Sequence, residues 1–194
     1  MVRYNLKIFT WIVVLLSLVV FFLFYVSSTS NSKITITEIW GCIGKTVAVV
    51  ATFLFLFNKW FWKWKCFHSW LVPVPNLNGR WRGNIHYYWD GAFHDKETEV
   101  RIVQTFLHIQ VQIKTDESWS NSVCSSFDID EDKGIRQLIY SYLNVPKASV
   151  RNRSQIHYGT ASLYISDDFQ QMEGNYWTDR KSQGELIFMR NRQN

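Results

Sequence analysis

The chain has 194 residues, of which 47% are hydrophobic and 19% charged, and it contains ten Trp and three Pro. This composition excludes a disordered chain, a collagen and a disulfide scaffold. The formal charge of +5 is unevenly placed: residues 1–70 carry seven bases and one acid, a net charge of +6, whereas residues 71–194 carry 14 bases and 15 acids, a net charge of −1. The second part is therefore not a polycation of the kind that binds DNA or RNA.

Two stretches are long and apolar enough to span a bilayer. Residues 8–26 contain no charged side chain, and a helix of this length measures roughly 28 Å against a hydrocarbon core of ~30 Å. The run exceeds the apolar core of a signal peptide, so we predict an uncleaved anchor. The second stretch, residues 39–57, contains Lys45 near its outer end, where the ammonium group can reach the headgroups. The sequence predicts two transmembrane helices within a membrane region of residues 1–70.

Positive charges flank these two spans unevenly. They lie before the first span and after the second, at Arg3, Lys7, Lys59, Lys63 and Lys65. Only Lys33 lies in the loop between the spans. The positive-inside rule therefore places both ends of the chain in the cytoplasm. Residues 58–65 alternate Trp with Lys, which is typical of a membrane interface.

The rest of the chain is more polar, and its apolar and polar residues alternate with a period of two. A linker at residues 71–78, with Pro73 and Pro75, leads into a domain of residues 79–194. Eight strands are expected there, at residues 79–90, 97–105, 107–115, 118–128, 135–143, 154–165, 170–178 and 183–190. Short connections favour an all-β fold, an eight-stranded antiparallel up-and-down barrel of the lipocalin-like kind, because closure removes exposed edges. A β-sandwich is the alternative.

Alternation also predicts which side chains face the barrel interior. If Trp81 faces inward, so do Ile85, Tyr87 and Trp89. Whether the tyrosines or the polar residues of 137–142 face inward is left open, because a single bulge exchanges the two faces.

Signatures of catalysis and of metal binding are missing from the sequence. There is no HExxH and no GxSxG motif, so we predict no catalytic residue and no enzyme. Cys42, Cys66 and Cys124 are odd in number and widely separated, which predicts neither a zinc site nor a disulfide. We expect His108 and His157 on strand surfaces, in contact with water.

The order of the sequence motifs is similar to that of a known family. Two spans and a linker precede the run LNGRWRG at 77–83, and the runs at 157–161, 172–180 and 184–186 are similar to that family's closing strands. Over essentially the whole chain the sequence resembles the two-transmembrane, β-strand-rich effectors of CBASS anti-phage systems. These are CD-NTase-associated membrane effectors with a cyclic-oligonucleotide-binding β-barrel. The Gly-x-Trp motif alone is less specific, since it also opens lipocalin barrels.

This resemblance implies a cell-killing effector of the bacterial inner membrane. It implies that a cognate nucleotidyltransferase makes a cyclic oligonucleotide, which the cytoplasmic barrel binds. Self-association of the membrane helices would then disrupt the inner membrane. The implied activating ligand is a cyclic dinucleotide, with no other cofactor and no DNA or RNA partner. Two alternatives are a membrane-tethered lipocalin-like barrel that binds an apolar ligand without killing, and a purely structural membrane partner.

Six residues are candidates for contact with such a ligand. They are Arg101, Tyr158, Asn175, Tyr176, Thr178 and Arg180. The two arginines are expected to meet phosphates, and the tyrosines with Asn175 to meet the bases. For Gly79, Trp81 and Arg190 we expect roles in closing and packing the barrel.

Overall fold

A computed structural model describes residues 6–28, 35–68, 70–72, 74–89, 91–130 and 132–191. The chain divides into two compact units, with the boundary between Pro73 and Val74. Arg3 and Lys33, on which the predicted orientation partly depends, lie outside the described residues, and so does the side chain of Trp89.

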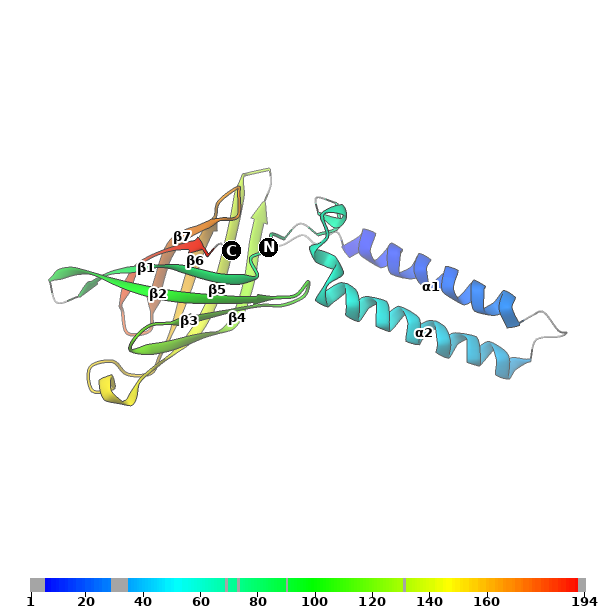
Figure 1. Cartoon of the computed structure of the whole chain (residues 1–194), viewed down its shortest axis with the longest axis horizontal. Helices are drawn as coiled ribbons and strands as arrows, with labels where there is room; N and C mark the ends of the chain where they lie inside the picture. The colour runs from blue at the N-terminus through cyan, green and yellow to red at the C-terminus, as the bar shows by residue number, and fades with distance from the viewer. Residues whose placement is uncertain are drawn as a thin grey trace. The chain divides into compact units, whose positions relative to one another are not determined.

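The N-terminal unit contains two antiparallel helices (Figure 1), α1 at Leu6–Ser28 and α2 at Ile36–Lys59. Both are long and apolar enough to cross a membrane. Each extends two or three residues beyond the predicted apolar run at either end. At the start of α2 the reason is a capping box, in which the Thr35 N–H donates to Glu38 Oε2 (2.7 Å) and the Glu38 N–H donates to Thr35 Oγ1 (3.4 Å).

One seam of α2 packs against α1. Its buried residues are Cys42, Thr46, Val50 and Phe57, at intervals of four and seven, so they share one face of the helix. Ser28 Oγ lies 3.6 Å from Cys42 Sγ. At the other end of the pair, the rings of Phe9 and Phe57 have centroids 6.0 Å apart. Two short 3-10 turns follow, η2 at Phe61–Lys63 and η3 at Lys65–Phe67.

The second unit is a closed barrel of eight antiparallel strands in chain order (Figure 1). The strands are β1 Gly79–Trp89, β2 Ala92–Gln104, β3 Ile109–Lys114, β4 Ser118–Asp130, β5 Ile135–Pro146, β6 His157–Ile165, β7 Gln171–Thr178 and β8 Gln183–Arg190. β8 pairs with β1 from Trp81↔Arg190 to Tyr87↔Gly184. This pairing confirms the predicted barrel and excludes the sandwich.

Three strands, β2, β5 and β6, differ from a predicted boundary by three or more residues. β5 ends at Pro146 rather than at residue 143. β2 begins at Ala92 rather than at residue 97, because it continues to pair with β1 as far as Trp89↔Ala92. The resulting hairpin projects from the barrel wall (Figure 1). β6 begins at His157 rather than at residue 154, because a 3-10 turn, η4 at Ala148–Val150, and further turns occupy the β5–β6 connection.

The inward face of β5 is shown by its own uninterrupted burial pattern, whereas a bulge interrupts the neighbouring β4. The β4–β5 register shifts between Ser122 and Cys124, so β4 exchanges its faces at this point. Tyr140 and Tyr142 are buried in the interior, at 1% and 8% exposure. Of the two sets left open by the sequence, the tyrosines therefore face inward.

The barrel is sealed at the end where the chain enters and leaves it. Trp81 is buried there, and its Nε1–H donates to the Leu77 carbonyl at 2.9 Å. The Arg190 guanidinium lies 5.4 Å from the centre of the Trp81 ring, and its Nη2 donates to the Asn78 carbonyl at 2.8 Å. Trp81 and Arg190 thus have the packing role that the sequence predicts.

Residues 74–78, which the sequence assigns to the linker, pack against this sealed end. Gln104 Oε1 accepts from the Leu77 N–H (2.8 Å), and Gln104 Nε2 donates to the Pro75 carbonyl (2.9 Å). Gln104 itself is buried, and these bonds satisfy its side-chain amide. Side chains of the described residues fill this half of the interior, and an interior cavity lies at the opposite end.

Candidate ligand-binding site

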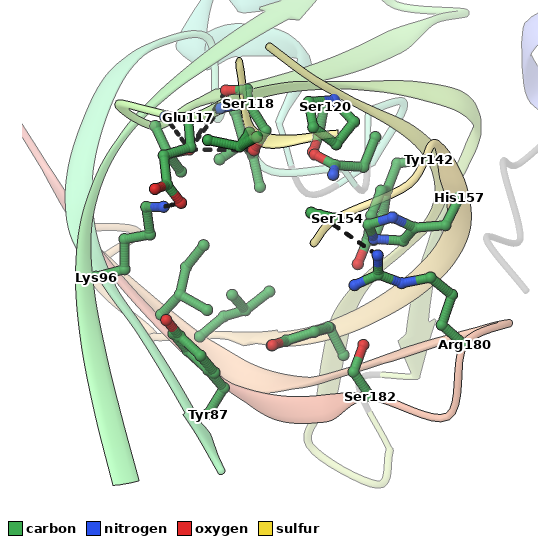
Figure 2. A pocket seen from close by; sticks show the side chains of 18 of the residues that line it. Tyr87, Lys96, Glu117, Ser118, Ser120, Tyr142, Ser154, His157, Arg180 and Ser182 are labelled. Carbon is green, nitrogen blue, oxygen red and sulfur yellow. Dashed lines mark hydrogen bonds and ion pairs between the residues drawn. The ribbon is translucent and has the colours of Figure 1, made fainter. Parts of the chain in front are cut away.

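A cavity of about 250 Å³ lies inside the open end of the barrel. The turns around it are β1–β2, β3–β4, β5–β6 and β7–β8, because in an up-and-down barrel these four connections share one end. Figure 2 shows side chains from several of these elements directed at an open centre. The site is therefore assembled from segments that are far apart in the sequence.

Two tyrosines of the cavity wall each lie against a glycine on the neighbouring strand. Tyr142 is opposite Gly159, where a Cβ atom would come within 2.4 Å of the tyrosine ring. Tyr176 is opposite Gly184, where a Cβ atom would come within 2.7 Å of Tyr176 Cε1 and 2.2 Å of a backbone oxygen. Only glycine leaves room for the rings in these positions.

The hydroxyls of Tyr140, Tyr142 and Tyr176 in the cavity wall remain protonated at physiological pH. Burial raises the pKa of Tyr176 to about 12 and raises the pKa values of Tyr140 and Tyr142 further. Within the described part of the chain, the buried Tyr140 hydroxyl has no hydrogen-bond partner. The wall thus presents neutral aromatic side chains that can donate hydrogen bonds.

A charged cluster occupies one side of the opening. Glu117, in the β3–β4 turn, accepts from Lys96 Nζ of β2 at 2.6 Å. The other oxygen of this carboxylate is paired with Arg153, from the β5–β6 connection. The hydrogen bond from Lys96 holds the pKa of Glu117 below its usual value. Glu117 therefore stays ionised and bridges two cations from different elements.

A second cluster lies across the opening (Figure 2). Arg180, in the β7–β8 turn, directs its Nη1 toward Ser154 Oγ (3.3 Å) and the Gln155 carbonyl (3.4 Å). His157 Nδ1 lies 2.8 Å from the same carbonyl, so this nitrogen carries a proton and donates it. Burial lowers the pKa of His157, which favours the neutral ring at pH 7.

The cavity has an excess of positive charge although the domain as a whole does not. Its lining includes Lys96, Arg153 and Arg180 against one carboxylate, Glu117. In a cavity with limited access to water, such an excess attracts anionic groups more strongly than the same charges would on an open surface.

The structure brings together some of the six ligand-binding residues proposed from the sequence. Tyr176 and Arg180 line the cavity. Thr178 lies on the same face as Tyr176, and its hydroxyl is 2.6 Å from that of Ser182, which lines the cavity. The other three, Arg101, Tyr158 and Asn175, have exposed side chains on the outer face of the barrel, outside this cavity.

Several residues of the cavity were not singled out by the sequence. His157 was expected in water on a strand surface, and this expectation is wrong: its side chain is 8% exposed and faces the interior. Lys96 could have been found, since it has the same parity as the buried Val100 and Ile102 of β2. Strand alternation gives no such indication for Glu117, because Glu117 lies in a turn.

A closed barrel with one sealed end and a cationic, tyrosine-lined cavity at the other is a binding domain. Residues 72–190 match the family described as Cap15, cyclic dinucleotide receptor domain. The chain belongs to this family of CBASS-associated cyclic dinucleotide receptors. The match is to a receptor domain and identifies no catalytic domain, and the ligand class that the domain implies is a nucleotide.

Two relatives carry the name CD-NTase-associated protein 15. The protein from Staphylococcus schleiferi is 30% identical over 148 residues, which are 76% of this chain and 78% of the relative. The protein from Yersinia aleksiciae is 39% identical over 105 residues, which are 54% of this chain and 49% of the relative. The match thus spans about half of the Yersinia protein's length.

Proposed function

We propose that the cavity holds one half of a cyclic dinucleotide, with a phosphate on either side of the opening. One phosphate meets Arg180, and the other meets the cluster of Lys96 and Arg153. The cavity, at about 250 Å³, is smaller than the pockets of ~300–1,000 Å³ that enclose drug-sized ligands. One base therefore stacks among the tyrosines, and the rest of the ligand lies at the opening.

The observation that carries this proposal is the separation of the cations into two clusters. A cyclic dinucleotide has two phosphodiester groups on opposite sides of its ring, and guanidinium groups match phosphates with two hydrogen bonds. An apolar ligand, the alternative raised by the sequence, would displace water from these cations and offer them no hydrogen-bond acceptor in exchange, which is costly. The cluster composition therefore favours an anionic ligand.

Glu117 holds the place of one phosphate before the ligand arrives. It bridges Lys96 and Arg153, and a phosphate that bonds to both cations would displace its carboxylate. The side chain is partly exposed, so it can rotate into water without being buried as an unpaired charge.

For the whole chain we propose a cell-killing effector of the bacterial inner membrane with both ends in the cytoplasm. Ligand from a cognate nucleotidyltransferase would promote association of several copies, because a ligand shifts an equilibrium toward the state that binds it more tightly. Two helices cannot line a conduit alone. Associated copies would bring several helix pairs together and disrupt the membrane.

Ligand binding is tested by the thermal unfolding of the full chain in detergent. Cyclic dinucleotides at saturating concentration are expected to raise the melting temperature, with stabilisation of about 2.7 kcal/mol at a hundredfold excess over Kd. Linear dinucleotides and a fatty acid serve as controls. Stabilisation by the fatty acid alone would favour the apolar-ligand alternative.

The membrane part is tested in cells and in vesicles. A reporter fused after residue 194 should be active in the cytoplasm only, since activity outside would separate the barrel from a ligand made inside. Full chain reconstituted in vesicles should release a trapped dye when a binding cyclic dinucleotide is added. An intact dye signal at saturating ligand would contradict membrane disruption.

A further inference from the structure

A basic groove of about 490 Å³ lies on the outer face of the barrel, across strands β1 to β4. Its charged lining residues are Arg80, Arg82, Arg101, Lys114 and Glu99. Glu99 lies opposite both Arg82 and Lys114 in the strand register, so it offsets part of their charge. Four cations against one carboxylate leave an excess of three positive charges, which attracts anionic groups.

Two of these arginines repel each other at the end of the groove nearer the sealed end. Arg80 lies directly opposite Arg101 in the β1–β2 register, and like charges in this position destabilise a strand pair. Both side chains are exposed, and neither guanidinium forms an ion pair with a carboxylate of the described residues. A phosphate between them would remove this repulsion, because guanidinium groups match phosphates with two hydrogen bonds.

The β2–β3 turn, at the sealed end, carries an exposed apolar side chain. The Thr105 N–H donates to the His108 carbonyl at 2.7 Å, which leaves Phe106 and Leu107 at the centre of the turn. Gly, Asn, Asp and Ser are the usual residues in such turns. Phe106 is buried, but Leu107 is 75% exposed, and Val103 on the outer face of β2 is 39% exposed. The turn therefore presents apolar surface to its surroundings instead of polar groups.

The order of these side chains matches the order of groups in a lipid leaflet. Leu107 lies at the tip, Val103 follows, and Arg101 with Arg80 lies one pleat further from the tip. The four residues from Arg101 to Thr105 span about 13 Å of strand, and part of this length is covered by the flexible arginine stems. Apolar side chains that enter a leaflet by ~5–10 Å thus leave the guanidinium groups near the phosphates. A soluble phosphate would satisfy the arginines but leave Leu107 in water.

Acidic side chains at the same end restrict a lipid contact to one side of the barrel. They lie in the β4–β5 hairpin and the β6–β7 turn, where Asp130 pairs with Lys133 at 3.0 Å and Asp167 pairs with Arg136 at 2.6 Å. These connections flank β5 and β6, which are opposite β1 and β2 in the closed strand order. Anionic lipid that meets the β2–β3 turn therefore meets the basic groove first.

We propose that the β2–β3 turn and the basic groove bind the surface of an anionic membrane. Leu107 and Val103 enter between the lipids, and Arg80 and Arg101 bind the phosphates of the headgroups. This inference rests on the proposed function in taking the N-terminal unit as anchored in a bilayer. β1 begins at Gly79, six residues after the boundary of that unit, and a tether of six residues spans at most about 22 Å.

A fluorescent label beside the turn tests this contact in the full chain. His108→Cys, in a background with Cys66→Ser and Cys124→Ser, places the label next to Leu107 without removing it, since His108 is exposed and Cys42 is buried. The chain is reconstituted without nucleotide in phosphatidylcholine vesicles with and without phosphatidylglycerol. Spin-labelled lipid in both leaflets quenches a label that touches the membrane. Phe93→Cys, on the β1–β2 hairpin at the opposite end, is the matched labelling site.

We expect quenching at position 108 and none at position 93, with stronger quenching when phosphatidylglycerol is present. Arg80→Gln with Arg101→Gln should shift the equilibrium between membrane-bound and free barrels about twenty-fivefold toward the free state, because each cation near an anionic surface contributes about fivefold. Leu107→Asn should weaken binding to both kinds of vesicle. Lys147→Gln with Arg151→Gln removes the same charge from the β5–β6 connection and should leave the quenching unchanged.

Three results would overturn the proposal. They are a label at position 108 that spin-labelled lipid does not quench, equal quenching at positions 108 and 93, and an arginine variant that binds as the wild type does. A label at position 108 that is shielded from water but not quenched by lipid would assign the turn to a protein partner. The substituted side chains are exposed, so an unchanged urea midpoint shows that lost quenching is a lost contact.

An alkaline wash of the vesicles separates this inference from the proposed function. A chain that the wash removes would contradict the membrane anchoring and the lipid contact together. A chain that resists the wash without quenching at position 108 would contradict the lipid contact alone. Thermal shift with cyclic dinucleotides reports separately on the cavity, because the vesicle measurements contain no nucleotide.

Discussion

The two ends of the barrel are built from the same strands but from different chemistry. At the sealed end, Trp81 and Phe188 fill the interior. The Gln104 side chain forms hydrogen bonds with the backbone of Pro75 and Leu77, in the segment that closes this end. At the open end, Lys96, Glu117 and Arg180 come from a strand and two turns and surround space. The sealed end specifies the fold, so substitutions there should change stability, whereas those at the open end should change binding.

The largest effect is expected for Trp81→Ala at the sealed end. The change removes a fully buried indole, its hydrogen bond to the Leu77 carbonyl and its contact with Arg190. It should lower the free energy of unfolding by about 3–5 kcal/mol in a urea titration. Trp119→Ala is the matched control, because Trp119 is 53% exposed, and it should cost under about 0.5 kcal/mol. Equal losses of unfolding free energy in both variants would contradict the view that the sealed end determines stability.

The next largest effect is expected for Arg180→Ala at the open end. Loss of a charge-assisted contact with phosphate should weaken binding of the wild-type chain's cyclic dinucleotide by about 1.5–3 kcal/mol, roughly ten- to a hundredfold in Kd. Titration calorimetry measures this. The urea midpoint should stay unchanged, since Arg180 is exposed and its two hydrogen bonds to described residues are long. Arg101→Ala, on the outer face, is the control and should bind normally.

Gly159→Ala, in the cavity wall, should change both the stability of the barrel and its affinity for the ligand. Gly159→Ala would place a Cβ atom 2.4 Å from the Tyr142 ring, so the ring must move into the cavity. Unfolding free energy should fall by about 1–3 kcal/mol, and ligand affinity should fall with it. A double variant that also carries Tyr142→Ala should lose less stability than the sum of the two single losses, because the clash disappears. Strict additivity of the two substitutions would show that the ring is not the obstacle.

Glu117→Gln is expected to change ligand affinity less than Arg180→Ala does, and in the opposite direction. The variant removes the charge that neutralises Lys96 and Arg153, so both cations become more available to phosphate. Affinity for the cyclic dinucleotide should rise by about two- to fivefold, the range of a partly exposed ion pair. Weaker binding in titration calorimetry would mean that Glu117 orients these side chains for the ligand.

The smallest effect concerns pH. Burial lowers the pKa of His157 below its ordinary value of 6.5, so just below pH 6.5 the unfolded chain binds a proton more readily than the folded barrel does. The free energy of unfolding should therefore fall as the pH drops through this range. Urea titrations at about pH 7.5 and about pH 5.5 measure the loss, and His157→Gln should reduce it. If the His157→Gln variant keeps the full pH dependence, groups other than His157 cause it.

The same contrast explains what the sequence could predict. Trp81 and the eight strands follow from alternation and from the Gly-x-Trp motif, whereas the packing of residues 74–78 against Gln104 does not. At the open end, the residues that line the cavity depend on which face of each strand points inward and on the conformation of the turns. Asn175 and Tyr176 are neighbours in one strand, so only one of them can face the cavity, and their common assignment to a ligand conflicts with the pleat. The β4 bulge and the bridge between Glu117 and Arg153 are tertiary features without a local pattern.

The adjacency of the first and last strands has a practical consequence for building a biosensor. Because Trp81 pairs with Arg190, the last strand ends at the sealed end of the barrel, away from the opening. The β1–β2 hairpin projects at the other end, where Phe93 is 84% exposed. A fluorophore attached at this position would sit beside the opening and change its emission when nucleotide enters. The fold thus separates the place for a fused module from the place for an optical probe.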